Sequence, residues 1–162
     1  MRSKLSLVTV GVLALAVAGV AVASAASSSS GAADQPVQVI RLVARQVQVT
    51  PLDFGAPGFS PGDQEVVAAD LYRGGRKVGQ DASVCQVVRV ANNAATVQCS
   101  VTLSLPDGQI TTQGLAISTG AGPGTFSLAI TGGTGAYRTA HGQMRITATA
   151  TDEVPLTLQL IR

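Results

Sequence analysis

The stretch FSLAITGGTGAYRTAHGQM, from Phe126 to Met144, is the strongest indicator of fold in this sequence. Phe126, Leu128 and Ile130 recur at every second position, which is the pattern of a strand with one buried face. The alternation stops at the glycine-rich segment TGGTG and resumes from Met144 onward. Because glycine adopts the positive φ values that other residues resist, the stretch predicts two strands joined by a tight corner.

Phosphate binding is the alternative interpretation of this glycine-rich corner. Such loops bring backbone N–H groups close to an anion, but they are followed by a helix and, for nucleotides, contain a Lys followed by Ser or Thr. Here Ala136, Tyr137 and Arg138 follow Gly135, and no helical periodicity succeeds them. We therefore interpret the stretch as a corner between strands.

Outward from the corner, the chain is a series of strand-like runs without a helical pattern. The first run slips in phase midway, which a bend, a bulge or two short strands would explain. The expected strands span residues 37–49, 65–72, 83–90, 97–105, 109–117, 126–130, 143–151 and 154–161. Eight strands with short turns and no crossover helices predict an antiparallel sheet, and closure into an eight-stranded β-barrel would remove its exposed edges. A barrel of this size is either packed with side chains or holds one small ligand.

The N-terminus has the features of a secretory signal peptide. Arg2 and Lys4 precede an apolar run over residues 5–22, and Ala-Ser-Ala at 23–25 matches the small-residue cleavage pattern. An uncleaved membrane anchor is the alternative, since the run approaches the length that spans a bilayer. We expect cleavage and secretion.

Composition then divides the rest of the chain and limits its partners. Residues 1–25 are the predicted signal peptide, 26–36 a flexible Ser/Gly/Ala linker, and 37–162 the barrel domain. The chain has 11 Lys and Arg against 9 Asp and Glu, so losing Arg2 and Lys4 makes the mature protein nearly neutral. Nucleic-acid binding requires clustered positive charge and is not expected.

A long loop over residues 50–63 contains three prolines and three glycines. Loops of this length without regular structure are commonly functional. This one carries Phe54 and Phe59, which either cap an apolar cavity or pack beneath the loop itself.

Cys85 and Cys99 are the only cysteines, and both are seven residues from Asn92, where we place the turn between their strands. They would therefore lie opposite each other across the ladder, where a disulfide can form in an exported protein. Two small buried residues facing one cavity are the alternative. A metal site is not expected, because His141 is the only histidine and such sites need three or four protein ligands.

Three segments together resemble the allene oxide cyclase barrel superfamily, which includes plant dirigent proteins. They are LYRGGRKVGQDASVCQVVRV at 71–90, LPDGQITTQG at 105–114, and the corner stretch at 126–144. The resemblance implies an eight-stranded antiparallel barrel with a hydrophobic central cavity, often trimeric. It also implies cofactor-free chemistry, in which the cavity folds a reactive substrate so that one ring closure or coupling is favoured.

The functional residues of these relatives are only partly matched. Plant allene oxide cyclases place a carboxylate in the first strand and an Asn in the second, whereas this chain has no Asp or Glu at 35–52 and has Ala69 at the second position. Dirigent proteins carry an Asp and an Arg around the corner, where this chain has Ala136 and His141. Cys85 falls where the plant cyclases have a cavity Cys.

His141 is the first candidate for a general acid or base, because the unperturbed pKa of histidine is about 6.5. Tyr137, beside it on the corner, is the second catalytic candidate. Glu65 and Asp70 have opposite parity on their strand, so they cannot both point inward. Asp81 is a further polar group for the barrel mouth. The candidate ligand-binding residues are Glu65, Asp70, Tyr72, Phe54, Phe59 and Cys85.

These features favour an exported barrel that binds a hydrophobic small molecule and guides a cofactor-free cyclisation or stereoselective coupling. Two alternatives stay open: a lipocalin-like ligand-binding protein without turnover, and a structural envelope protein whose barrel is filled. We expect no cofactor, no metal and no membrane association after signal cleavage. From the resemblance we expect a homotrimer.

Overall fold

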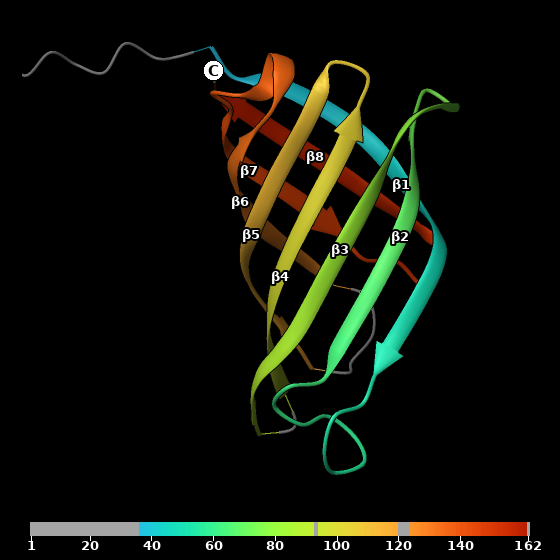
Figure 1. The fold of residues 1–162 in the computed structure, drawn as a ribbon, viewed down its shortest axis with the longest axis vertical. Coiled ribbons are helices and arrows are strands. Elements are labelled where there is room, and N and C mark those ends of the chain that lie inside the picture. Colours follow the sequence, from blue (N-terminus) through green and yellow to red (C-terminus); the bar gives the residue numbers. More distant parts are fainter. Residues whose placement is uncertain (1–35, 93, 120–123, 162) are drawn as a thin grey trace, which may run out of the picture. The chain divides into compact units, whose positions relative to one another are not determined.

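The computed structural model describes residues 36–92, 94–119 and 124–161, which form a closed antiparallel barrel. Its eight strands pair in sequence order, and β1 closes the barrel against β8 (Figure 1). The strands are β1 (Gln38–Leu52), β2 (Gln64–Arg73), β3 (Arg76–Ala91), β4 (Ala94–Leu105), β5 (Gly108–Ser118), β6 (Thr125–Gly133), β7 (His141–Thr147) and β8 (Glu153–Ile161). The predicted eight-stranded barrel is confirmed.

The predicted signal peptide and linker lie outside the described residues. Within the described ranges, no helix has both the length and the apolar character needed to cross a bilayer.

Local differences from the sequence expectations have simple causes. The β2–β3 turn needs only Gly74 and Gly75, whose φ values are 56° and 79°, so β3 begins at Arg76 rather than near residue 83. The phase slip in the first strand is a bulge between Gln46 and Gln48. β7 ends at Thr147 instead of continuing to residue 151.

The glycine corner joins β6 to β7 and contains a short 3₁₀ turn, η1 (Gly135–Tyr137), at the top of the barrel in Figure 1. Gly135 has a φ of 58°, and a Cβ on it would overlap the carbonyl oxygen of Asp107 in the β4–β5 turn. The Ala136 N–H donates to that same oxygen at 2.8 Å. The close approach of two turns therefore requires glycine, and it places Tyr137, only 5% exposed, at this end of the barrel.

The core occupies the half of the barrel nearest this corner. Two residues that lie directly opposite each other on neighbouring strands point to the same side of the sheet. Alternate residues of every strand therefore face the interior of the barrel. The interior of this half is filled by fully buried aliphatic side chains: Leu71, Leu103, Ile110, Leu128, Met144, Leu158 and Leu160. This half of the barrel is packed, and the other half is hollow.

Candidate functional site

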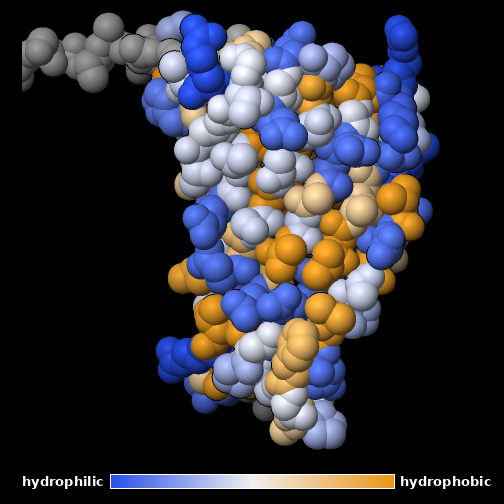
Figure 2. Space-filling model, viewed as in Figure 1, coloured by the Kyte–Doolittle hydropathy of each residue, from blue (hydrophilic) through white to orange (hydrophobic). Residues whose placement is uncertain are grey.

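A cavity of about 860 Å³ occupies the end of the barrel opposite the glycine corner. This size is within the range of small-molecule sites. The β1–β2 loop and the end of β5 surround its mouth, where Phe59 is 66% and Ile117 72% exposed. Figure 2 shows hydrophobic side chains interspersed with polar ones over the lower half of this face. The wall is mainly apolar, including Val87, Val97 and Phe126.

A disulfide between Cys85 and Cys99 lies in the cavity wall. The two cysteines are direct partners in the β3–β4 ladder, as their equal distance from the turn at Asn92 predicted. Asn92 itself has a φ of 51°, the left-handed geometry that asparagine tolerates. Glu65 is the β2 partner of Cys85, so its carboxylate shares the inward face with the disulfide and lines the cavity.

The carboxylate of Asp63 holds the β1–β2 loop in place at the mouth. It accepts hydrogen bonds from the Phe54 N–H at 2.8 Å, the Ser60 N–H at 2.6 Å and the Ser60 hydroxyl at 3.1 Å. The backbone N–H groups, that of Phe54 first, hold the pKa of Asp63 below its usual value. The backbone of Asp63 also pairs with Val87 of β3, which anchors the loop to the barrel.

This loop presents one of its two aromatic side chains to the cavity. Phe59 lines it, whereas Phe54 is 53% exposed and is not part of the wall. The prediction that the loop aromatics cap a cavity therefore describes the position of Phe59 and not that of Phe54.

The carboxylates of Asp53, Asp63 and Glu65 all line the cavity, and its described wall includes no Lys, Arg or His. Sequence reasoning identified Glu65 but missed the two aspartates. The Pro-Gly-Asp sequence at 61–63 was the available signal, since aspartate commonly binds backbone N–H groups in such turns.

Asp81 also points into the barrel, because its ladder partners Ala69 and Leu103 are core residues. Burial raises its pKa from 3.8 to about 6. It lies four residues from Cys85 on the same face of β3, toward the packed half, and does not line the cavity. Because Asp81 and Cys85 lie an even number of positions apart on one strand, the sequence could have shown that Asp81 points inward. It could not have shown how far along the barrel axis Asp81 lies.

The remaining predicted site residues lie elsewhere. Tyr137 is buried beside the packed core, and His141 is exposed at the same end, with Nδ1 3.3 Å from the Thr139 carbonyl oxygen. Neither lines the cavity, and their catalytic role stays a prediction.

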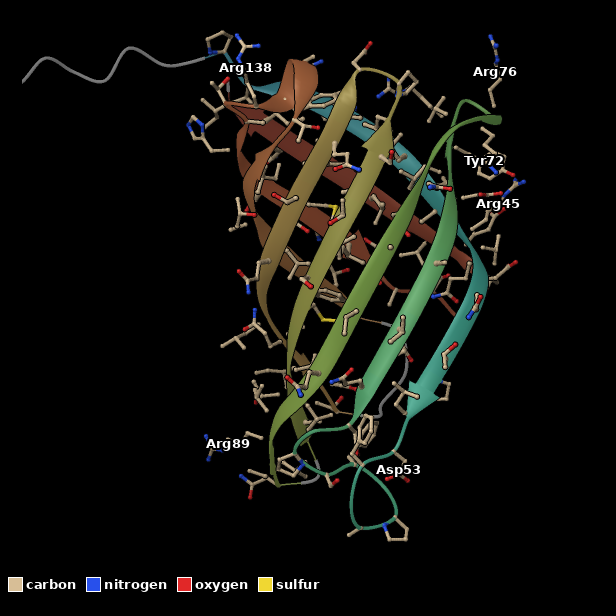
Figure 3. All side chains as sticks on the ribbon, in the orientation of Figure 1. Arg45, Asp53, Tyr72, Arg76, Arg89 and Arg138 are labelled. Atoms are coloured by element: carbon tan, nitrogen blue, oxygen red, sulfur yellow. A yellow bond between two sulfur atoms is a disulfide. The ribbon has the colours of Figure 1, made fainter. Side chains whose placement is uncertain are left out.

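Asp70 and Tyr72 lie on the outer face of β2, and the opposite parity of Glu65 and Asp70 is borne out by the register. Asp70 forms an ion pair with Lys77 at 2.7 Å. The guanidinium carbon of Arg45 packs over the ring of Tyr72, 4.3 Å from the ring centroid. Figure 3 shows the two side chains next to each other at the edge of the barrel.

In the part of the chain that the structure describes, no group of three or more His, Cys, Asp or Glu side chains is arranged to hold a metal ion. The described wall of the cavity itself offers carboxylates, hydroxyls and apolar side chains.

Comparison with known proteins places this barrel in a family. Residues 43–157 match the allene oxide cyclase barrel-like domain. The chain belongs to this family. A search of the curated proteins finds no match.

Several solved structures share the architecture. A pyocyanin demethylase is 32% identical, with a TM-score of 0.70, and the similarity covers 76% of this chain and 99% of that one. A Diels–Alderase from Streptomyces koyangensis is 18% identical, with a TM-score of 0.60 over 80% of this chain and 71% of that one. A pterocarpan synthase dirigent protein is 13% identical, with a TM-score of 0.55 over 78% and 83% of the two chains. The last two similarities show a shared fold.

Proposed function

We propose that this protein binds a hydrophobic small molecule in the open half of its barrel and promotes a cofactor-free reaction of the bound molecule. The observation that carries the proposal is the cavity of about 860 Å³, which is walled mainly by apolar side chains and is also lined by the acidic residues Asp53, Asp63 and Glu65. Holding a reactive molecule in one geometry lowers the entropic part of its barrier, so shape alone can favour one ring closure or coupling.

Glu65 is the proposed proton acceptor. It is on a strand rather than a loop, it lines the cavity, and its ladder partner Cys85 is fixed by the disulfide. Asp63 is less suited to proton transfer, because its oxygens already accept hydrogen bonds from the loop backbone. A carboxylate beside an apolar wall is a suitable general base.

The similarity to a pyocyanin demethylase supports an enzymatic role on a small organic molecule, because it extends over nearly the whole of that chain. The disulfide is compatible with export, where oxidising conditions preserve such bonds. The expected homotrimer stays a prediction.

Binding is tested by titrating the purified protein with the neutral fluorescent tricycle acridine. Ala116 lines the cavity, whereas Ala82 is exposed on the outer face of β3, so Ala116→Phe and Ala82→Phe form a matched pair. We expect Ala116→Phe to weaken binding about tenfold or more, and Ala82→Phe to have no effect. Equal affinities in both variants would show that the ligand does not enter the barrel.

Turnover is tested by incubating the protein with pyocyanin and following products by mass spectrometry. We expect product from the parent protein and its loss in Glu65→Gln, with pyocyanin binding retained. Pyocyanin that is bound but returned unchanged by the parent supports the alternative function of a ligand-binding protein without turnover for this compound.

A further inference from the structure

The charged residues in the described wall of the cavity are all acidic. Its wall includes the carboxylates of Asp53, Asp63 and Glu65, and no described basic side chain belongs to it. Among the residues that the structure describes, Asp53 and Glu65 have no ion-pair partner, because the two ion pairs involve Arg45 with Glu153 and Lys77 with Asp70. The cavity therefore carries uncompensated negative charge beside an apolar wall.

Positive charge at the same end of the barrel points elsewhere. Arg89 is exposed on β3 and is not part of the cavity wall. Figure 3 shows it at the foot of the barrel, directed away from the strands, while Asp53 lies at the loop on the other side. Arg45, higher on the barrel, is held by Glu153 at 2.8 Å on the outer face.

We infer that the cavity selects a hydrophobic organic cation, such as a cationic aromatic heterocycle, over neutral or anionic molecules of the same shape. The inference rests on the proposed function, because it names the class of molecule that the cavity would bind. The apolar wall of the cavity provides the surface that binds the ligand, and the carboxylates select a ligand that is positively charged.

The physical basis is field focusing by a low-dielectric wall. Carboxylates that line an apolar cleft interact with a bound charge more strongly than they would in open water. An anion entering this cavity would lose its hydration and meet only like charge. A cation would replace its lost hydration with the interactions of Asp53 and Glu65.

Two further features favour a cationic ring system. Backbone N–H groups keep Asp63 ionised, so its negative charge persists as the pH falls. Phe59 and Phe126 add aromatic rings to the wall, and such rings attract cations through their negative faces.

The test compares three fluorescent tricycles of the same shape: N-methylacridinium as the cation, acridine as the neutral form, and acridine carboxylate as the anion. Titrations are made above neutral pH, where acridine is uncharged. We expect the cation to bind about tenfold more tightly than acridine, which corresponds to about 1.4 kcal/mol, and the anion to bind most weakly. Added salt should reduce the advantage of the cation.

The variant Asp53→Asn/Glu65→Gln should remove most of this preference, measured as the ratio of the affinities for N-methylacridinium and acridine. Asp107→Asn changes the net charge at the β4–β5 turn, at the opposite end of the barrel, and should preserve the preference. Equal affinities for the three probes, or a preference unchanged in the double variant, would overturn the inference while the binding function stands. If none of the probes binds the parent protein, the proposed function itself fails.

Discussion

Replacing Asp81 with asparagine should stabilise the barrel at neutral pH and have little effect in acid. Asp81 faces the interior between Ala69 and Leu103, and burial raises its pKa from 3.8 to about 6. The folded protein therefore holds this proton more tightly than the unfolded chain does. Between about pH 4 and 6 the free energy of unfolding should fall as the pH rises, because the folded state must bury a charge that the unfolded state keeps in water.

The size of the effect follows from the pKa. One pKa unit corresponds to about 1.4 kcal/mol, so the full change is about 3 kcal/mol, and partial exposure of the side chain reduces it to about 1 to 3 kcal/mol. Asp81→Asn resembles the protonated form in shape and lacks the charge. The free energy of unfolding of the variant should exceed that of the parent by this amount near neutral pH and by almost nothing near pH 3.

Urea denaturation of the parent and Asp81→Asn at both pH values measures the difference directly. Asp107→Asn, in the exposed β4–β5 turn, controls for the loss of one negative charge. The reasoning is refuted if Asp81→Asn changes stability by the same amount at both pH values, since a group that titrates alike in both states contributes no such difference.

Three other substitutions test the framework around the cavity. Replacing both Cys85 and Cys99 with alanine should lower the free energy of unfolding by about 3 kcal/mol in urea without reductant, because the bond closes a loop of 14-residue separation; unchanged stability would contradict this. Gly135→Ala should lower the melting temperature through its positive φ and its overlap with a carbonyl oxygen, whereas Gly124→Ala, with no atom near its Cβ position, should not. Asp63→Asn should speed proteolytic cleavage within the β1–β2 loop by weakening hydrogen bonds to its backbone; cleavage at the parent rate would show that the carboxylate does not hold the loop.

The sequence was sufficient for the barrel because its signals are local. Period-two alternation defines strands, and residues such as Asn92 and Gly135 mark turns by their backbone preferences. The cysteine pairing followed from the same logic, since antiparallel partners are equally distant from their turn. Parity likewise predicted that Glu65 and Asp70 face opposite sides.

Depth along the barrel was harder to predict. Which half of the barrel is hollow depends on how the side chains of all eight strands fill the interior together. The position of the cavity therefore cannot be predicted from any single segment of the sequence. The hydrogen bonds of Asp63 similarly join residues through a loop of irregular shape. One relation was accessible: successive turns of an antiparallel meander alternate between its two ends. The loop after β1 and the corner after β6 must therefore be at opposite ends, which separates His141 from the cavity.

The packed half of the barrel has a kinetic consequence. Leu103, Leu158 and their neighbours fill the opposite half of the barrel, so among the described residues the cavity opens at the end that Phe59 and the β1–β2 loop surround. In the proposed reaction, substrate and product would share this opening, so a product that stays bound would exclude the next substrate. For the proposed reaction, inhibition by product should therefore be competitive, and product release past Phe59 and the β1–β2 loop should set an upper limit on the turnover rate.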